Sequence, residues 1–272
     1  MTNVNTKAMP APDVAELRGA TSKPPTILLF GDSHTHVIQR AIDKRIGKGL
    51  PVPVSAHRLL KEKNGNKIGD TSFEDFLQAA GRLARTDIVL SMIGGNQHAV
   101  MSTIQHPRPF DFFAPDKNRV DDSAEVVPYR ALEALFATGL RRGDGRSLEA
   151  LRKATSARVV HIIPPPPKSD NSFIEQHHES FFAQDLPGRG VSPPGLRLKF
   201  WELQTRSLQA LCADLGIEIM LPPAATVDSR GFLRPEYYAQ DATHANWHYG
   251  ERLLREVEKR FLQPTRRAAG DA

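Results

Sequence analysis

The chain has 272 residues, of which 40% are hydrophobic and 25% charged, and its formal net charge is +5. The apolar content is sufficient for a buried sheet, and no apolar run approaches the roughly 20 residues that a membrane-spanning helix needs. An internal disulfide is excluded because Cys212 is the only cysteine, and we interpret it as a core thiol. Basic residues are spread widely, in pairs such as Arg141-Arg142, which disfavours nucleic-acid binding.

The first residues are polar and proline-containing, and they lack the basic start, apolar middle and cleavage site of a secretory signal. We therefore expect a disordered lead-in over residues 1–24, a single domain over residues 25–262 and a flexible tail over residues 263–272. The expected compartment is the cytoplasm.

Strand-like apolar runs alternate along the chain with segments of helical periodicity. This alternation predicts a parallel sheet with helices on both faces. The predicted strands are Thr26–Phe30, Val52–Ala56, Asp87–Ile93, Ala157–Ile163 and Ile217–Leu221. The predicted helices run from Ser33 to Ile46 and over Phe73–Ala84, Tyr129–Leu140, Ser147–Thr155, Leu198–Leu215 and Trp247–Phe261.

Two irregular insertions interrupt this alternation, near residues 105–127 and 168–196. The first is rich in Pro, Phe and Asp, and the second contains Phe and several Pro and Gly residues. Both come after predicted strands. Long loops at the carboxyl edge of a parallel sheet are usually functional or disordered. We expect Pro107–Phe113 and Phe173–Phe182 either to wall a pocket, as a lid would, or only to cover the flank of the sheet.

The first motif is Gly31-Asp32-Ser33, where the first predicted strand gives way to a helix. A serine in this position has its hydroxyl at the carboxyl edge of the sheet. Its N–H lies among the unpaired donors of a helix N-terminus, whose field favours developing negative charge. This geometry suits an acyl-transfer nucleophile, although a serine that merely caps the helix would give the same pattern.

Two further motifs lie at the ends of predicted elements: Gly94-Gly95-Asn96 follows a buried strand, and Asp241-Ala242-Thr243-His244 precedes the last helix. Serine at neutral pH needs a base within hydrogen-bond reach, which His244 can supply. The base in turn needs a group that fixes its tautomer and orientation, and Asp241 can accept from its other ring nitrogen.

In this order, the three motifs resemble the blocks of the SGNH (GDSL-like) hydrolase superfamily, over roughly Pro25 to Leu262. The resemblance implies a three-layer α/β/α, flavodoxin-like fold and a serine hydrolase that cleaves an O-acyl ester through an acyl-enzyme, without cofactor or metal. The implied catalytic residues are Ser33, Asp241 and His244. The implied oxyanion donors are the N–H of Ser33, a glycine N–H from a second block and the side-chain amide of Asn96.

The second block is harder to locate. Gly69 is our choice, because it precedes a helix whose start is marked by Thr71 and Glu74 at capping-box spacing. Gly65, in the turn Asn64-Gly65-Asn66, is the alternative. Gly69 could equally be an ordinary loop glycine.

The sequence departs from the family pattern at two positions. Gln97 follows the asparagine where the family usually has aspartate, and His34 follows the serine where many relatives have leucine. The Gly-Asp-Ser-His variant is similar to SGNH domains attached to polysaccharide acyltransferases. An acyltransferase that delivers the acyl group to a sugar hydroxyl therefore stands beside the hydrolase, and a non-catalytic binding protein on the same scaffold is the third alternative.

The other histidines are not expected to bind metal. His244 and His248 are four residues apart, but Ala245 occupies the place of the glutamate that a zinc-protease helix requires. We expect His248 on the surface, and His34 and His36 either in the pocket or solvated. The expected partner is a small-molecule or carbohydrate ester, with neither nucleic acid nor a membrane span involved.

Overall fold

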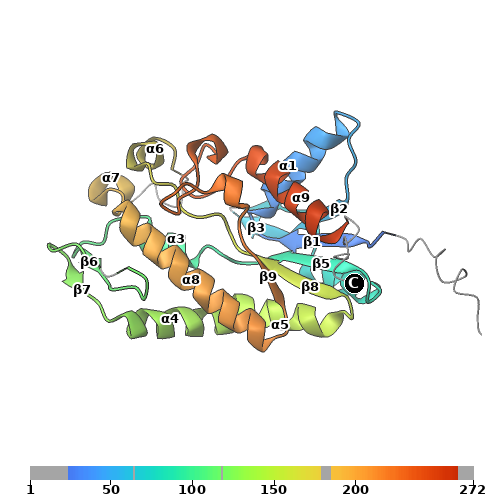
Figure 1. Cartoon of the computed structure of the whole chain (residues 1–272), viewed down its shortest axis with the longest axis horizontal. Helices are drawn as coiled ribbons and strands as arrows, with labels where there is room; N and C mark the ends of the chain where they lie inside the picture. The colour runs from blue at the N-terminus through green and yellow to red at the C-terminus, as the bar shows by residue number, and fades with distance from the viewer. Residues whose placement is uncertain (1–23, 64, 118, 179–184, 263–272) are drawn as a thin grey trace, which may run out of the picture.

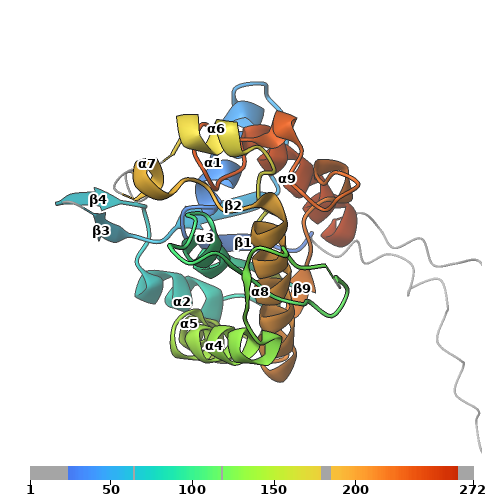
Figure 2. The ribbon, with the colours of Figure 1, turned by 90° about the vertical axis from the view of Figure 1, so that its left-hand side faces the viewer.

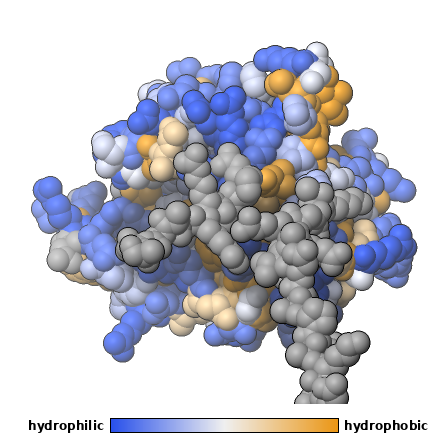
Figure 3. Space-filling view, turned by 45° about the vertical axis from the view of Figure 1, so that its right-hand side comes forward, coloured by the Kyte–Doolittle hydropathy of each residue, from blue (hydrophilic) through white to orange (hydrophobic). Residues whose placement is uncertain are grey.

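The computed structural model describes residues 24–63, 65–117, 119–178 and 185–262. The lead-in expected before residue 24 and the tail expected after residue 262 lie outside this range. No helix of the described residues is both long and apolar enough to cross a membrane. On the face seen in Figure 3, hydrophilic residues predominate and the hydrophobic ones form separate patches.

A sheet of five parallel strands forms the centre of the molecule (Figure 1). The strands are β1 (Ile27–Gly31), β2 (Val54–Arg58), β5 (Ile88–Met92), β8 (Arg158–Ile162) and β9 (Glu218–Met220). Their spatial order is β2-β1-β5-β8-β9, so the chain starts next to one edge and reverses direction once. This is the order of a flavodoxin-like sheet, and the parallel α/β fold predicted from the alternation of elements is confirmed.

Helices cover both faces of this sheet (Figures 1 and 2). The larger helices are α1 (Thr35–Ile46), α2 (Phe73–Gly81), α4 (Tyr129–Arg142), α5 (Asp144–Ala154), α8 (Pro194–Asp214) and α9 (Trp247–Phe261). Alternate residues of β1 separate the two layers: Ile27 and Leu29 pack with α1 and α9, whereas Phe30 stacks on Phe76 of α2. This alternation follows from the two-residue period of a strand.

Helices α1 and α9 approach each other closely at Gly250. A Cβ atom at that position would overlap the backbone oxygen of Val37. The last helix is therefore held directly against the helix that follows Ser33, which brings the segment before α9 close to the end of β1.

The remaining elements are short. They are β3 (Lys61–Lys63), β4 (Asn66–Ile68), β6 (Phe110–Asp111), β7 (Glu125–Val126), α3 (Gln97–Ser102), α6 (Asn171–Gln176), α7 (Leu186–Arg189) and the 3-10 turns η2 (Ala224–Thr226) and η3 (Pro235–Tyr237). The hairpin β3–β4 was not predicted, because its three-residue strands are charged and lack an apolar alternation.

The predicted start of α2 at Phe73 is confirmed, but its predicted capping residues are wrong, and so is the predicted start of α5. The cap of α2 is Ser72, whose hydroxyl accepts from the Asp75 N–H, so the capping pair lies one residue after Thr71 and Glu74. Thr71 instead bonds His57 and Asp70 through its side chain. Helix α5 begins at Asp144, three residues before the predicted Ser147, because Gly143 turns the chain directly from α4 into α5.

The insertion of residues 105–127 packs on α4 and α8 rather than on the sheet. Its Phe112 is fully buried against Phe136 of α4 and Phe200 of α8. This third apolar cluster anchors the insertion. Part of the second insertion, residues 179–184, lies outside the described residues, so the expectation for Phe173–Phe182 can be examined only up to residue 178.

Candidate active site

Ser33 lies in the turn between β1 and α1. Gly31, two residues earlier, has no room for a side chain, because a Cβ atom there would overlap the backbone of Met92 on β5. The helix is capped at His34, without a side-chain cap bond, so Ser33 does not serve as its N-cap. Its hydroxyl instead points toward His244, with 2.8 Å between Oγ and Nε2. The capping interpretation of Ser33 is therefore wrong.

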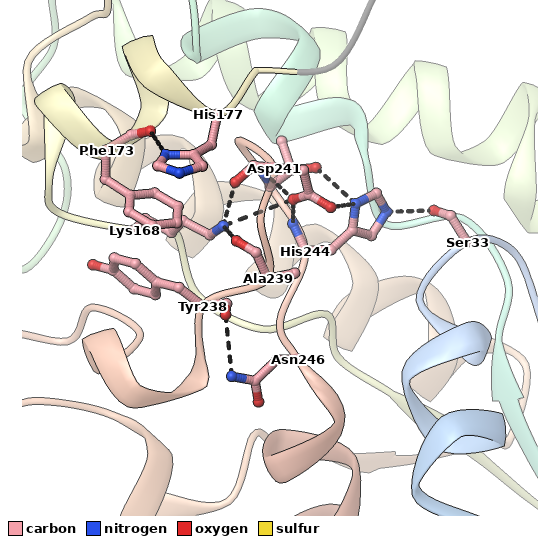
Figure 4. A network of polar contacts seen from close by, with 10 residues as sticks. Ser33, Lys168, Phe173, His177, Tyr238, Ala239, Asp241, His244 and Asn246 are labelled. Carbon is pink, nitrogen blue, oxygen red and sulfur yellow. Dashed lines mark hydrogen bonds and ion pairs between the residues drawn. The ribbon is translucent and has the colours of Figure 1, made fainter. Parts of the chain in front are cut away.

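His244 and Asp241 come from the loop before α9 and face Ser33 (Figure 4). The Nδ1 atom of His244 lies 3.0 Å from Oδ2 of Asp241. The other carboxylate oxygen accepts the backbone N–H groups of Thr243 and His244, at 3.0 and 2.7 Å. The loop thus closes on its own carboxylate, which fixes the position of the imidazole between Asp241 and Ser33.

Asp241 is held in its charged form. Burial alone would raise its pKa, but the hydrogen bond and charge of His244, with a smaller effect of Lys168, move the pKa well below its usual value. An ionised Asp241 accepts from Nδ1–H of His244. The neutral imidazole then carries a lone pair on Nε2, directed at the Ser33 hydroxyl.

Lys168 is a buried cation behind this pair. Its side chain is 1% exposed, and its ammonium donates to the backbone oxygens of Ala239 (2.7 Å) and Asp241. The same nitrogen lies 3.7 Å from Oδ1 of Asp241. The rings of Phe173 and Tyr238 flank it at 4.8 and 5.1 Å (Figure 4). Lys168 therefore joins the second insertion to the loop that carries Asp241.

Asn96 follows β5, in a loop whose glycines both have positive φ: +74° at Gly94 and +97° at Gly95. The loop is held by two carboxylates. Asp32 accepts the N–H of Gly94 at 2.6 Å, and Asp144 accepts the N–H of Gly95. A Cβ atom on Gly94 would overlap the Asp144 side chain, so only glycine fits there.

Helix α8 supports the same loop from behind. The buried Gln204 donates to the backbone oxygen of Gly95 and accepts the N–H of His98. In the family pattern, the residue after the asparagine has this bracing task. In this chain, the brace is supplied by a residue more than one hundred positions later.

His34 binds the side chain of Asn96. Its Nε2 lies 3.1 Å from Oδ1 of Asn96, and because an amide oxygen can only accept, Nε2 carries the hydrogen. Burial, followed by the charge of His244, lowers the pKa of His34 to about 3, so its ring is neutral beside the His244 ring. His34 is therefore not solvated, and it is not among the residues that line the cavity beside Ser33 either. The Asn96 amide nitrogen has no acceptor among the described residues.

The two second-block glycines differ in their surroundings. Gly69 has a φ of +93° and packs on the backbone of Leu59, whose N–H donates to the Gly31 oxygen at 2.8 Å. Gly65 lies in the turn of the β3–β4 hairpin, with open space around its α-carbon. Gly69 is therefore tied to the carboxyl end of β1, whereas Gly65 projects on a hairpin.

A cavity of about 350 Å³ opens beside Ser33 and His244. Among the described residues, its walls come from α1, from the end of β2 and from residues 239–247. Pro107–Phe113 does line a cavity, of about 640 Å³, through Pro109, Phe110 and Asp111, but it contributes no wall to the cavity beside Ser33. His36 lines the cavity and His248 is exposed. No group of three potential metal ligands occurs among the described residues.

The sequence interpretation missed Lys168, Asp32 and Asp144. The only signal for Lys168 in the sequence was its position after four prolines, because such a segment is stiff and restricts where the next residue can lie. The two aspartates carried no signal, since they contact residues 62 and roughly 50 positions away.

Comparison with protein-family models gives no match, and neither does comparison with curated protein sequences. Among solved structures, the chain is similar to a lipopolysaccharide acetyltransferase periplasmic domain from Salmonella ser. Paratyphi A. That domain is 15% identical, with 92% of this chain and 88% of that chain covered and a TM-score of 0.46.

Two esterases show similar values. An aryl esterase of M. smegmatis is 12% identical and has a TM-score of 0.44, and a carbohydrate acetylesterase from Sinorhizobium meliloti is 13% identical with a TM-score of 0.42. Each of the two matches covers 87% of this chain and 97% of the esterase chain. These likenesses are too low to carry any conclusion about activity. The fold itself, with motif blocks after β1, after β5 and before α9, is the one that the resemblance to the SGNH superfamily implies.

Proposed function

We propose that this protein is a serine-dependent enzyme that cleaves an O-acyl ester, of a carbohydrate or of a small molecule, through an acyl-enzyme. One observation carries the proposal: His244 lies 2.8 Å from the Ser33 hydroxyl through Nε2 and 3.0 Å from the Asp241 carboxylate through Nδ1. Nucleophile, base and orienting carboxylate in this linear order are the requirement for activating serine.

In the first step, Ser33 Oγ attacks the ester carbonyl carbon while Nε2 of His244 takes the hydroxyl proton. The carbonyl oxygen becomes an oxyanion, and the N–H of Ser33, the N–H of Gly69 and the amide of Asn96 are its proposed donors. None of these three donors bonds another described residue, which leaves them free for this task. Each such donor is worth about 3–4 kcal/mol of transition-state stabilisation.

Collapse of the intermediate expels the alcohol, which leaves with the proton from His244. In the second step, water attacks the Ser33 ester, His244 again takes and returns the proton, and the carboxylic acid is released. A sugar hydroxyl that replaces water in this step would make the enzyme an acyltransferase with the same residues. Addition of sugar acceptors to the assay, with detection of acylated sugar, distinguishes the two outcomes.

The proposal is tested with a fluorophosphonate probe and p-nitrophenyl acetate. The wild type should be labelled and active, and Ser33→Ala should be folded, unlabelled and slower by several orders of magnitude. Ser91→Ala is the matched control: Ser91 also contacts a histidine, His161 at 3.3 Å, but both are buried in the sheet. This control should label like the wild type. Absence of labelling in the wild type would favour a non-catalytic binding protein, and full labelling of Ser33→Ala would refute Ser33 as the nucleophile.

A further inference from the structure

Two cavities lie end to end along helices α1 and α9. The first is the one beside Ser33, and the second, of about 390 Å³, is lined by the last turns of α1 and the first turns of α9. Trp247 lines both, and Arg40 of the first cavity is one helical turn from Lys44 of the second. We call these two adjoining cavities together the α1–α9 groove.

Basic side chains dominate the groove. Among its described lining residues, seven are Lys or Arg and three are Asp or Glu. Arg40 and Lys44 are four residues apart and share one face of α1, and Lys48 follows in the turn after the end of that helix. The cationic residues of the groove besides Arg45 are Arg40, Lys44, Lys48, Arg58, Arg252 and Arg255.

The three carboxylates of the groove already have cationic neighbours. Glu251 binds Arg45 and Arg255, at 2.7 and 2.8 Å. Asp241 is taken by His244 and Lys168, as described above, and Glu236 lies 3.8 Å from Arg234.

Five of the cations have no such neighbour. No described carboxylate forms an ion pair with Arg40, Lys44, Lys48, Arg58 or Arg252, although Arg252 donates to the hydroxyl of Tyr237. The groove therefore carries an uncompensated positive charge next to the Ser33 hydroxyl.

Arg40 of α1 and Arg58 of β2 line the first cavity together with Ser33 and His36. His36 lies there, on the first turn of α1, and its pKa is lowered by burial and then by the positive charges of Arg58 and Arg40. Two guanidinium groups from different elements, α1 and β2, thus act on one point beside Ser33. An anionic group of a bound substrate would lie between them.

Trp247 adds an aromatic surface at the centre of the groove. It is half-buried, its ring stacks on His248, and the ammonium of Lys44 lies 6.0 Å from its centroid. A flat apolar face bordered by cations suits a ring that has an apolar face and carries a negative charge. A uronic acid residue of a saccharide is such a ring.

We infer that the ester cleaved at Ser33 belongs to an acidic saccharide chain that lies along the α1–α9 groove, with its carboxylates on the cations of α1 and β2. The inference rests on the proposed function for the ester bond and goes beyond it for the substrate. A nucleic acid would also match the charges. A uronic acid polymer fits better because it carries, along its length, both carboxylates and hydroxyls that can be acylated.

The first experiment compares acetate release from O-acetylated polygalacturonate and from neutral O-acetylated xylan. The wild type should have a kcat/KM about tenfold higher on the acidic polymer at low salt, and this advantage should shrink toward 0.5 M salt as screening increases. Equal rates on both polymers, or an advantage that salt does not change, would overturn the inference.

Charge-removing double variants locate the effect. Arg40→Gln/Arg58→Gln and Lys44→Gln/Lys48→Gln should each lose about tenfold in kcat/KM on the acidic polymer, mainly through KM, and should lose clearly less on the uncharged ester p-nitrophenyl acetate. The matched control is Arg82→Gln/Arg85→Gln, which removes the same charge from exposed positions between α2 and β5. Equal losses in the control would mean that net charge, and not the groove, is responsible.

Binding separates this inference from the proposed function. Ser33→Ala should bind non-acetylated oligogalacturonate in calorimetry, and the two groove variants built on it should bind at least about tenfold more weakly. If p-nitrophenyl acetate is not cleaved but oligogalacturonate still binds, the proposed function fails and the groove assignment stands. Tighter binding of a 12-nucleotide RNA than of an oligogalacturonate of equal charge would show that the ligand class is wrong.

Discussion

Replacement of Lys168 by methionine should shift the acidic limb of the pH–rate profile upward and destabilise the protein. Methionine keeps the length and apolar bulk of the side chain, so it still contacts Phe173 and Tyr238, but it removes the ammonium. The backbone oxygens of Ala239 and Asp241 then lose a donor, and the Asp241 carboxylate loses a cation 3.7 Å away.

The size of the shift follows from the distances. The ammonium is 3.7 Å from one oxygen of Asp241, and the other oxygen is 3.0 Å from the imidazole of His244, so the two basic groups are roughly 7 Å apart. A unit charge at this distance contributes about 1–2 kcal/mol at an effective dielectric constant of about 20–40, which is about one pH unit. Without that positive charge, His244 accepts a proton more readily, and activity should be lost at higher pH than in the wild type.

The assay is kcat/KM for p-nitrophenyl acetate between pH 4.5 and 9, with thermal unfolding measured in parallel. Loss of a buried, hydrogen-bonded cation costs about 3–5 kcal/mol of unfolding free energy. Lys199→Met is the control. Lys199 on α8 is also buried, and it binds Asp111 and two backbone oxygens of the first insertion. It should be destabilised with an unmoved pH profile. If both variants are destabilised and both keep the wild-type profile, Lys168 is only structural.

Three further predictions concern the oxyanion side, acid stability and helix packing. Asn96→Ala should lower kcat by about one hundred- to one thousand-fold with little change in KM, and an effect on KM alone would make Asn96 a substrate-binding residue. His34→Leu frees the Asn96 amide to rotate and should lower kcat by about tenfold. His98 and His161 are buried, which lowers the pKa of each imidazole to about 4. In the folded protein both imidazoles therefore stay neutral down to about pH 4, whereas in the unfolded chain they take up protons below about pH 6.5. The unfolding free energy should therefore fall by up to about 1.4 kcal/mol per histidine and pH unit from pH 6.5 to 4, less steeply in His161→Leu, and equal melting temperatures at pH 7 and 5 would contradict this. Gly250→Val should lower the unfolding free energy by about 1–3 kcal/mol through its clash with Val37, whereas Gly195→Ala, in open space, should be nearly neutral; equal effects would refute the packing argument.

The sheet was predictable from sequence because its inner strands β1, β5 and β8 are short apolar runs, a pattern that burial on both faces imposes. The edge strand β2 is more polar and lies at Val54–Arg58, two residues after its predicted position. Helix α9 was predicted with its observed bounds, Trp247–Phe261, since its apolar residues keep a strict helical period. The hairpin β3–β4 and the cap at Ser72 were missed for a different reason. The hairpin is a backbone ladder of three mostly polar residue pairs, and the cap depends on one side-chain hydrogen bond, so neither leaves an apolar period in the sequence.

The candidate site divides in the same way. Ser33, Asn96, Asp241 and His244 lie at element ends, where strand topology brings residues together regardless of their separation in sequence. Asp32 shares that location, but its role cannot be predicted from the sequence, because it consists in accepting the backbone N–H of Gly94 in another loop. Gln204 and Lys168 reach the site from α8 and the second insertion, and a pattern of elements cannot predict which side chain of such segments points inward.

The two carboxylates below the Asn96 loop also determine which of its groups can stabilise negative charge. They accept the N–H groups of Gly94 and Gly95, so neither of these two amides can serve an oxyanion, whereas the Asn96 side-chain nitrogen has no acceptor among the described residues. Two anions so close would oppose a developing oxyanion. Asp32 is offset by Lys61, 2.5 Å from its Oδ1, and the pKa of Asp144 is raised by burial and by Asp32. The loop can therefore be held by carboxylates at a reduced electrostatic cost to the transition state, and Lys61, remote from these glycines in sequence, acts on the same balance as Asn96.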